Sequence, residues 1–112
     1  MPYRPPPLGP KQLHVTAPAR TDIDEALAHL AETAGLQVAL SFAEQIDAHL
    51  FRLSDVGHAG VSREWLSAGL RMTTLGRYCI YFRVTPTETR IIRFLHGARD
   101  VGQIDFATED TP

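Results

Sequence analysis

The residues best suited to chemistry in this 112-residue sequence are arginines, which make up ten of its eleven basic residues. A guanidinium can hold a carboxylate or phosphate through two parallel hydrogen bonds. A single arginine on a strand is usually ordinary solvated surface. However, alternation and cross-strand pairing place Arg83 beside Tyr81 and bring Arg71 or Arg93 alongside, and such a group of like charges needs a counter-charge. We therefore expect Arg71, Tyr81, Arg83 and Arg93 to bind an acidic protein segment.

Other kinds of reactive site find little support in the sequence. The five histidines are scattered without a close pair, so no metal site is predicted, and no motif suggests a cofactor. There is no nucleophile elbow or phosphate-binding loop. Cys79 is interpreted as a small buried hydrophobe within a strand. His96 and Arg99, at the end of the last predicted strand, could act in catalysis, contact a target or cap the strand.

Two consecutive helices must hold these residues in place from one side. Thr21 is a good N-cap and Asp24 stands three residues on, so we expect the first helix to begin here. Apolar residues recur at helical spacing up to Gly35, which supplies the stop. A second apolar stripe runs from Leu36 to the glycine at position 57. With almost no linker, the two helices are predicted to form an αα-hairpin.

The strands are predicted from period-two patterns. One short strand covers residues 12–15, and three more cover residues 70–75, 78–84 and 90–96, separated by tight turns. The predicted fold is α+β in the order β-α-α-β-β-β, with the helical hairpin on one face of a largely antiparallel four-stranded sheet. The second face of the sheet is not obviously covered by the hairpin. Trp65, between helix and strand, either packs on the core edge, which we favour, or forms an exposed contact. The predicted core between hairpin and sheet consists of Ile23, Leu27, Leu30, Leu40, Ile46, Leu50, Ile80 and Phe82.

Composition sets limits on location and partners. The single cysteine allows no internal disulfide, and no apolar run of about 18 residues suggests a membrane span. We also find no signal-peptide pattern and expect a cytoplasmic protein. The net charge of -2 argues against binding of DNA by the chain alone. Charge is segregated, however, with -3 over residues 1–60, +4 over 61–100 and -3 over 101–112. We divide the chain into a proline-rich extended or disordered arm (1–11), a folded domain (12–100) and an acidic tail (101–112).

A family resemblance lies in the strand region. The segment from Gly-Arg-Tyr at 76–78 to Tyr-Phe-Arg-Val at 81–84, and the closing His-Gly-Ala-Arg-Asp at 96–100, closely resemble ParE-type toxins of the ParE/RelE superfamily. Residues 16–30 also resemble the start of the first helix in that family. The resemblance covers about residues 12–100 and implies the ParE/RelE toxin fold. It also implies a toxin of a type II toxin–antitoxin pair, neutralised by a cognate antitoxin.

The two branches of this superfamily differ in their targets. The resemblance implies inhibition of DNA gyrase for the ParE branch and cleavage of messenger RNA on the ribosome for the RelE branch. RelE-type cleavage relies on lysines, arginines and a C-terminal tyrosine, whereas this chain has Cys79 at one arginine position and no tyrosine after Arg99. We therefore expect a protein-binding gyrase inhibitor that is not an enzyme. A ribosome-dependent endoribonuclease and an inactive antitoxin-binding module are the alternatives.

For a toxin of this kind, the residues singled out above have expected roles. Arg71, Tyr81, Arg83 and Arg93 are expected to bind the antitoxin, and His96 and Arg99 are expected to bind the target. The expected antitoxin is a ribbon-helix-helix protein with an acidic, amphipathic tail, which forms a hetero-oligomer with the toxin.

Overall fold

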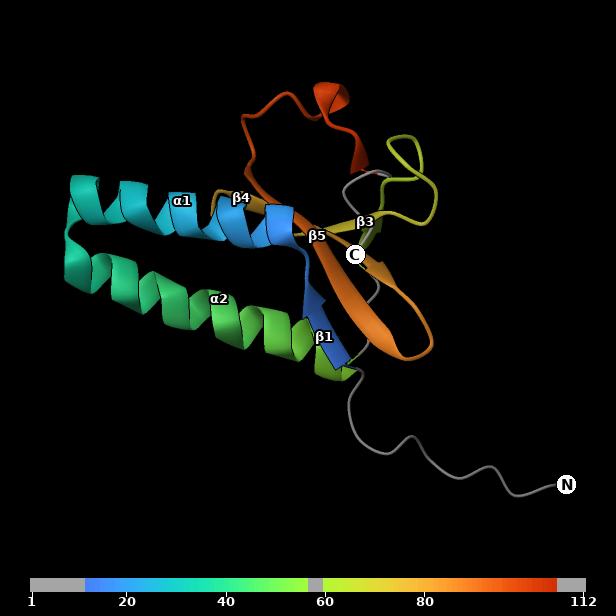
Figure 1. Cartoon of the computed structure of the whole chain (residues 1–112), viewed down its shortest axis with the longest axis horizontal. Coiled ribbons are helices and arrows are strands. Elements are labelled where there is room, and N and C mark those ends of the chain that lie inside the picture. Colours follow the sequence, from blue (N-terminus) through green and yellow to red (C-terminus); the bar gives the residue numbers. More distant parts are fainter. Residues whose placement is uncertain (1–11, 57–59, 107–112) are drawn as a thin grey trace, which may run out of the picture.

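Two long helices lie against a five-stranded sheet in the computed structural model, which describes residues 12–56 and 60–106 (Figure 1). The predicted N-terminal arm, residues 1–11, and residues 107–112 lie outside that description. The elements in chain order are β1 (Gln12–Val15), α1 (Ala17–Ala34), α2 (Leu36–Val56), β2 (Val61–Ser62), β3 (Arg71–Leu75), β4 (Tyr78–Val84), β5 (Glu88–His96) and the 3-10 turn η1 (Val101–Gln103). This confirms the predicted α+β class and the helical hairpin.

The sheet has the strand order β1-β5-β4-β3-β2. β1 runs parallel to β5, and the other neighbours are antiparallel. The fifth strand, β2, was not predicted, because two residues are too short to show an alternating pattern. It pairs with Arg71 and Met72 of β3 and so extends the edge of the sheet.

The first helix begins earlier than its sequence suggested. Its N-cap is Thr16, whose hydroxyl accepts a hydrogen bond from the Ala19 backbone N–H (3.3 Å), so the prediction of Thr21 as N-cap was wrong. Pro18 is tolerated because it falls in the first helical turn, where its missing N–H is not needed. The Thr16 hydroxyl also contacts the carbonyl oxygens of Ile91 and Ile92 in β5 (2.9 and 3.1 Å). The helix therefore begins at the residue whose side chain also forms hydrogen bonds with β5.

The main core lies between the hairpin and one face of the sheet. Of the predicted members, Ile23, Ile46, Leu50, Ile80 and Phe82 are buried, and Leu27 packs at the margin. Leu30 is only half-buried. Leu40 was wrongly placed in the core, because 51% of it is exposed. The hairpin extends past the sheet at its closed end (Figure 1). Leu40 lies on the outward side of α2, whereas Phe42, two residues on, packs against the rings of Tyr78 and Phe94.

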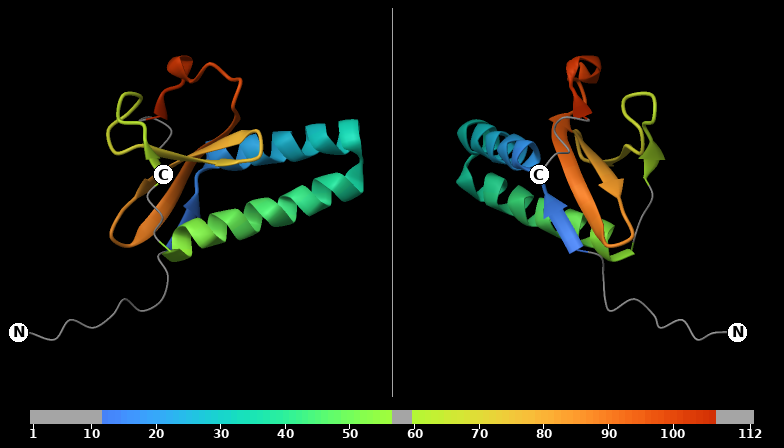
Figure 2. Two further views of the ribbon diagram at one scale, coloured as in Figure 1. Left: turned by 180° about the vertical axis from the view of Figure 1, so that it is seen from behind. Right: turned by 45° about the vertical axis from the view of Figure 1, so that its right-hand side comes forward.

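A second, smaller core covers the opposite face of the sheet. It contains Leu70, Tyr81, Ile92, Leu95 and Phe106. The covering layer comes from the loop that follows β2 and from the segment after β5, on the side of the sheet away from the hairpin (Figure 2). The hairpin therefore leaves this face to other segments of the same chain, as far as the structure describes it. Val101, Ile104 and Phe106, which we had placed in the acidic tail, belong to this packed layer.

Among the described residues, neither helix is both long and apolar enough to cross a membrane.

Candidate functional site

The best-defined charged group joins the first helix to the last strand. Asp22 of α1 and Arg93 of β5 form a two-pronged ion pair, with the Arg93 Nη2 donating to Asp22 Oδ1 at 2.8 Å and the Nε donating to Oδ2. Both side chains are buried. The backbone N–H of Phe94 also donates to Asp22 Oδ2 (3.0 Å). Arg93 thus has its counter-charge within the chain, contrary to our expectation that an outside segment would supply it.

The position of Asp22 follows from the shortness of β1. The strand pairing of β1 with β5 ends at Val15 and Ile91, and the Thr16 N–H then bonds the Ile91 carbonyl (3.1 Å). Beyond that point the edge of β5 faces α1 instead of a strand. The Asp22 carboxylate, in the second turn of α1, accepts a hydrogen bond from the Phe94 N–H at this edge. Without it, the N–H would be a buried donor that no strand pairs.

Arg83 holds the two covering segments of the second core together. Its Nε donates to the Ala68 carbonyl (3.1 Å) and its Nη1 to the Phe106 carbonyl (3.4 Å), while Nη2 reaches the Ser67 hydroxyl. The side chain is half-buried rather than fully solvated. Arg83 therefore links the loop after β2 to the segment after β5. A partner that contacts Arg83 must reach a guanidinium that these bonds already hold in place.

Tyr81 and Arg71 are less accessible than the sequence suggested. Tyr81 is 5% exposed and packs against the ring of Phe106, with ring centroids 4.9 Å apart. Burial is the main cause that raises the pKa of its phenol, with a smaller contribution from Cys79. Arg71 is half-buried and donates from Nη2 to the Gly60 carbonyl (3.1 Å), while its buried Nε has no hydrogen-bond partner in the described part of the chain.

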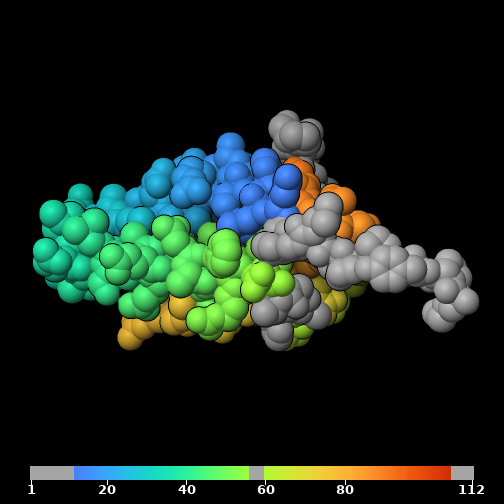
Figure 3. Space-filling model, turned by 90° about the horizontal axis from the view of Figure 1, so that it is seen from below, coloured from blue at the N-terminus to red at the C-terminus, as the bar shows by residue number. Residues whose placement is uncertain are grey.

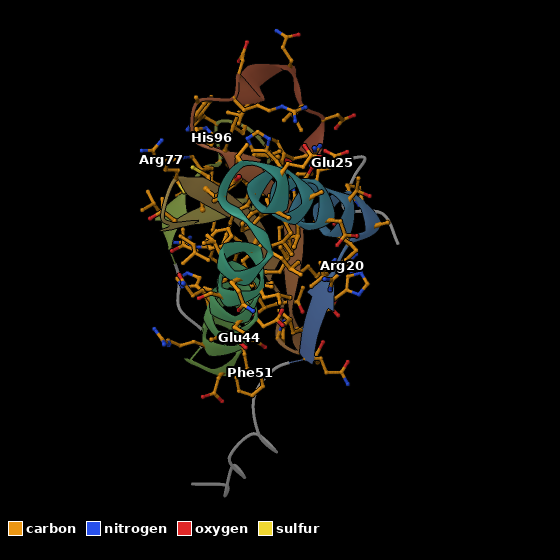
Figure 4. All side chains as sticks on the ribbon, turned by 90° about the vertical axis from the view of Figure 1, so that its left-hand side faces the viewer. Arg20, Glu25, Glu44, Phe51, Arg77 and His96 are labelled. Atoms are coloured by element: carbon orange, nitrogen blue, oxygen red, sulfur yellow. The ribbon has the colours of Figure 1, made fainter. Side chains whose placement is uncertain are left out.

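His96 and Arg99 meet in an open pocket of about 330 Å³ at the end of β5. Glu25 and His29, one turn apart on α1, line the opposite wall, and Tyr78 and Phe94 also line it. Figure 4 shows Glu25 and His96 at the same end of the molecule, beside α1. Asp22 also lines this pocket, so the ion pair described above lies beside it.

Local contacts orient the groups at the mouth of this pocket. The His96 Nδ1 accepts a hydrogen bond from the Ala98 N–H (3.1 Å), and the Arg99 N–H donates to the His96 carbonyl (3.0 Å). The ring of Tyr78 stacks on Phe94 at 4.7 Å and meets the edge of His96 at 5.5 Å. The pocket therefore offers an aromatic wall, a guanidinium, two imidazoles and two carboxylates, of which that of Asp22 is already paired with Arg93, and these groups together suit recognition of a polar side chain.

Neither Asp22 nor Phe106 was identified as important from the sequence. Asp22 was interpreted as a charge favourable to the helix dipole, because its partner lies 71 residues away along the chain. Phe106 is an isolated aromatic in an acidic stretch, which was the one available signal that the stretch is anchored. Among the described residues no group of three or more His, Cys, Asp or Glu side chains could hold a metal.

Comparison with known proteins places this geometry in context. Residues 13–101 match the family model described as the ParE toxin of the type II toxin–antitoxin system, parDE. One similar solved structure is described as the chromosomal ParDE toxin–antitoxin system from P. aeruginosa. It has a TM-score of 0.67 and 27% identity, and the match covers 77% of this chain and 95% of the other.

A second similar structure shares the fold. It is the RelBE2 toxin–antitoxin complex from Mycobacterium tuberculosis, with a TM-score of 0.54 and 22% identity, covering 82% of this chain and 97% of that one. A search of curated proteins gives no match. Since the family model spans most of the chain and includes the pocket and the buried ion pair, the chain belongs to the ParE toxin family of type II toxin–antitoxin systems.

Proposed function

We propose that this ParE-family toxin inhibits DNA gyrase by binding it, without making or breaking a bond itself, and that a cognate antitoxin neutralises it. The observation that carries the target side of this proposal is the pocket at the end of β5. It presents Arg99 and His96 beside Glu25 on a rigid aromatic wall. Such a mixture of charges suits recognition of a protein side chain, and Arg and aromatic groups are the usual anchors of protein interfaces.

The same pocket gives the endoribonuclease alternative its one specific support. His96, His29 and Glu25 are side-chain types that can transfer protons, and Arg99 could stabilise a developing phosphate charge. Two observations count against cleavage. The described residues include no lysine, and no tyrosine follows Arg99 in the sequence. We therefore favour binding over cleavage.

We also propose that the antitoxin docks on the side of the sheet away from the hairpin, where Arg83 lies. Arg71 pairs with Phe82 of the main core and so lies on the other face of the sheet, where it can act only at the sheet edge beside β2. An acidic amphipathic tail, of the kind expected on a ribbon-helix-helix antitoxin, complements this arginine-rich part of the chain. Tyr81 and Arg93 are buried, so we assign them a supporting role beneath this surface.

A gyrase supercoiling assay with purified protein tests the target. Wild-type protein should inhibit supercoiling, and Arg99→Ala should weaken inhibition at least tenfold, the equivalent of about 1.4 kcal/mol. Arg20→Ala is the matched control, because Arg20 is an exposed arginine of α1 that does not line the pocket (Figure 4). Inhibition that is insensitive to both changes would remove the pocket from the mechanism. Codon-positioned cuts in translated messages, seen by primer extension soon after induction, would establish the endoribonuclease alternative instead.

A further inference from the structure

The outward face of α2 carries large apolar side chains that the fold leaves in solvent. Leu36, Leu40 and Phe51 are 66%, 51% and 63% exposed. At about 100° per residue, the three positions fall within about 60° of one another around the helix. Ile46 and Leu50, which belong to the core, lie on the neighbouring face of α2, about 80° and 40° from Leu36 in the opposite direction around the helix. Single exposed apolar residues need no explanation, but three aligned along one helix form a stripe of the kind that marks an interaction site.

Acidic residues lie within and around this stripe. Glu44 and Asp47 project from the same side of α2, between Leu40 and Phe51. Figure 4 shows Glu44 and Phe51 on the side of α2 that faces away from α1, and Figure 3 shows the face of the molecule that α2 forms. Residues 17–56 hold two arginines against seven acidic residues. Only Asp22 of these seven belongs to the buried pair with Arg93, so the hairpin presents a negative surface.

The negative charge around the stripe limits which partners can bind there. A second copy of the same face would bring Glu44 and Asp47 against like charges, which disfavours a symmetric dimer. An acidic antitoxin tail would be repelled for the same reason. A partner helix with an apolar side flanked by lysine or arginine could do both. Its apolar side would pack on the leucines and Phe51, and its basic side chains would pair with the surrounding carboxylates.

We propose that the outer face of α2 is a second protein-binding surface that takes a basic amphipathic helix of a partner protein. The stripe from Leu36 to Phe51 is about 22 Å long, which matches about four turns of partner helix. Leu36, Leu40 and Phe51 supply the apolar anchors, and Glu44 and Asp47 fix the orientation of the basic side chains. The surface lies on the helical layer, so it is separate from the arginines of the sheet, and the proposal does not depend on gyrase being the target.

A synthetic helix provides the probe. We would titrate the protein with a peptide of about 18 residues, built of leucine and lysine at helical spacing, and with a matched peptide in which glutamate replaces lysine. Calorimetry should show one-to-one binding of the lysine peptide and at least tenfold weaker binding of the glutamate peptide.

Matched variants then locate the site. The double change Leu40→Ala with Phe51→Ala should weaken binding of the lysine peptide at least tenfold. Val38→Ala is the control, since Val38 is similarly exposed at 48% but lies on the other side of α2. Likewise Glu44→Gln should weaken binding, and Glu32→Gln on α1 should not. All these side chains are exposed, so the variants should keep the wild-type melting temperature.

Three results would overturn the proposal. The first is equal binding of the acidic and basic peptides. The second is a loss for Val38→Ala as large as that for the Leu40 and Phe51 change. The third is a concentration-dependent dimer in sedimentation that Leu40→Ala abolishes, which would make this face a contact between copies of the chain.

Discussion

At the scale of single residues, the buried pair of Asp22 and Arg93 fixes α1 against the edge of β5. Asp22 meets both the Arg93 guanidinium and the Phe94 N–H, so removal of its charge leaves a buried cation and weakens a buried backbone bond. Breaking such a pair by changing one partner typically costs about 3 to 5 kcal/mol. We expect Asp22→Asn to lower the free energy of unfolding by an amount in this range, measured by urea denaturation.

Asp24→Asn is the control for that measurement. Asp24 lies two residues away on the same helix but is exposed, and its change should alter stability by no more than about 0.5 kcal/mol. Equal effects of the two substitutions would mean that the Asp22–Arg93 pair contributes no particular stability.

Tyr81 gives a pH-dependent prediction at the same scale. Its folded-state pKa lies above the ordinary value of 10.0, mainly because the phenol is buried. The unfolded chain therefore loses this proton first, and the stability that the neutral phenol contributes is present below pH 10 and lost as the pH rises through the folded-state pKa. Tyr81→Phe should flatten the fall in unfolding free energy above pH 10. An unchanged slope in alkaline urea titrations would contradict this, and Tyr78→Phe serves as the comparison.

At the scale of elements, the sequence predicted those parts of the fold that depend on local periodicity. The strands β1, β3 and β4, the boundary at Gly35 and the hairpin all agree with the structure. Features set by distant contacts were missed. The start of α1 depends on hydrogen bonds from Thr16 to β5, and the exposure of Leu40 depends on which side of α2 the rest of the chain covers. Neither can be obtained from a residue's neighbours in sequence.

The site was predictable to a similar extent. The sequence singled out His96 and Arg99, which the structure brings into one pocket, but not Glu25 and His29, which reach that pocket from α1. It also singled out the arginines as candidate binding residues, but it did not show that Arg93 and Arg83 have partners inside the chain. Pairing between residues so far apart leaves no local pattern.

Trp65 and Phe106, two isolated aromatics in the segments after β2 and β5, test whether burial that depends on distant contacts was missed from the sequence. We expected Trp65 to pack, but it is 72% exposed, whereas Phe106 is 1% exposed and fills the second core. Phe106→Ala should therefore lower the free energy of unfolding by about 3 to 5 kcal/mol. Trp65→Ala should change it by no more than about 0.5 kcal/mol. Thermal or urea unfolding of the two variants measures both, and a larger cost for Trp65→Ala would show that the covering layer is packed differently.

At the scale of the whole molecule, opposite charges lie on different layers. The hairpin is negative, whereas residues 61–100, which form most of the sheet and its covering loop, carry +4. A molecule divided in this way can hold an acidic partner on one side and a basic partner on the other. Its complex with an acidic antitoxin should therefore weaken as salt is added, because exposed charge pairs are screened.

We expect the antitoxin to act through one arginine above all, Arg83. The Arg83 side chain is half-buried and donates to the backbone carbonyls of Ala68 and Phe106. An acidic side chain that reaches it therefore forms a partly desolvated ion pair. Such pairs are worth more than those at a solvated rim. Arg83→Glu should weaken antitoxin binding at least tenfold, about 1.4 kcal/mol, in titration calorimetry. Circular dichroism must confirm the fold, since the same change removes bonds between two segments.

Arg52→Glu is the control for antitoxin binding, because Arg52 is exposed on α2 in the helical layer. If both Arg71→Glu and Arg83→Glu kept wild-type affinity while Phe51→Ala lost it, the antitoxin would dock on the hairpin. The negative charge of the hairpin argues against that outcome, because an acidic tail would then bind where like charges are densest. The contrast between Arg83 and Phe51 variants therefore tests which of the two layers the antitoxin recognises.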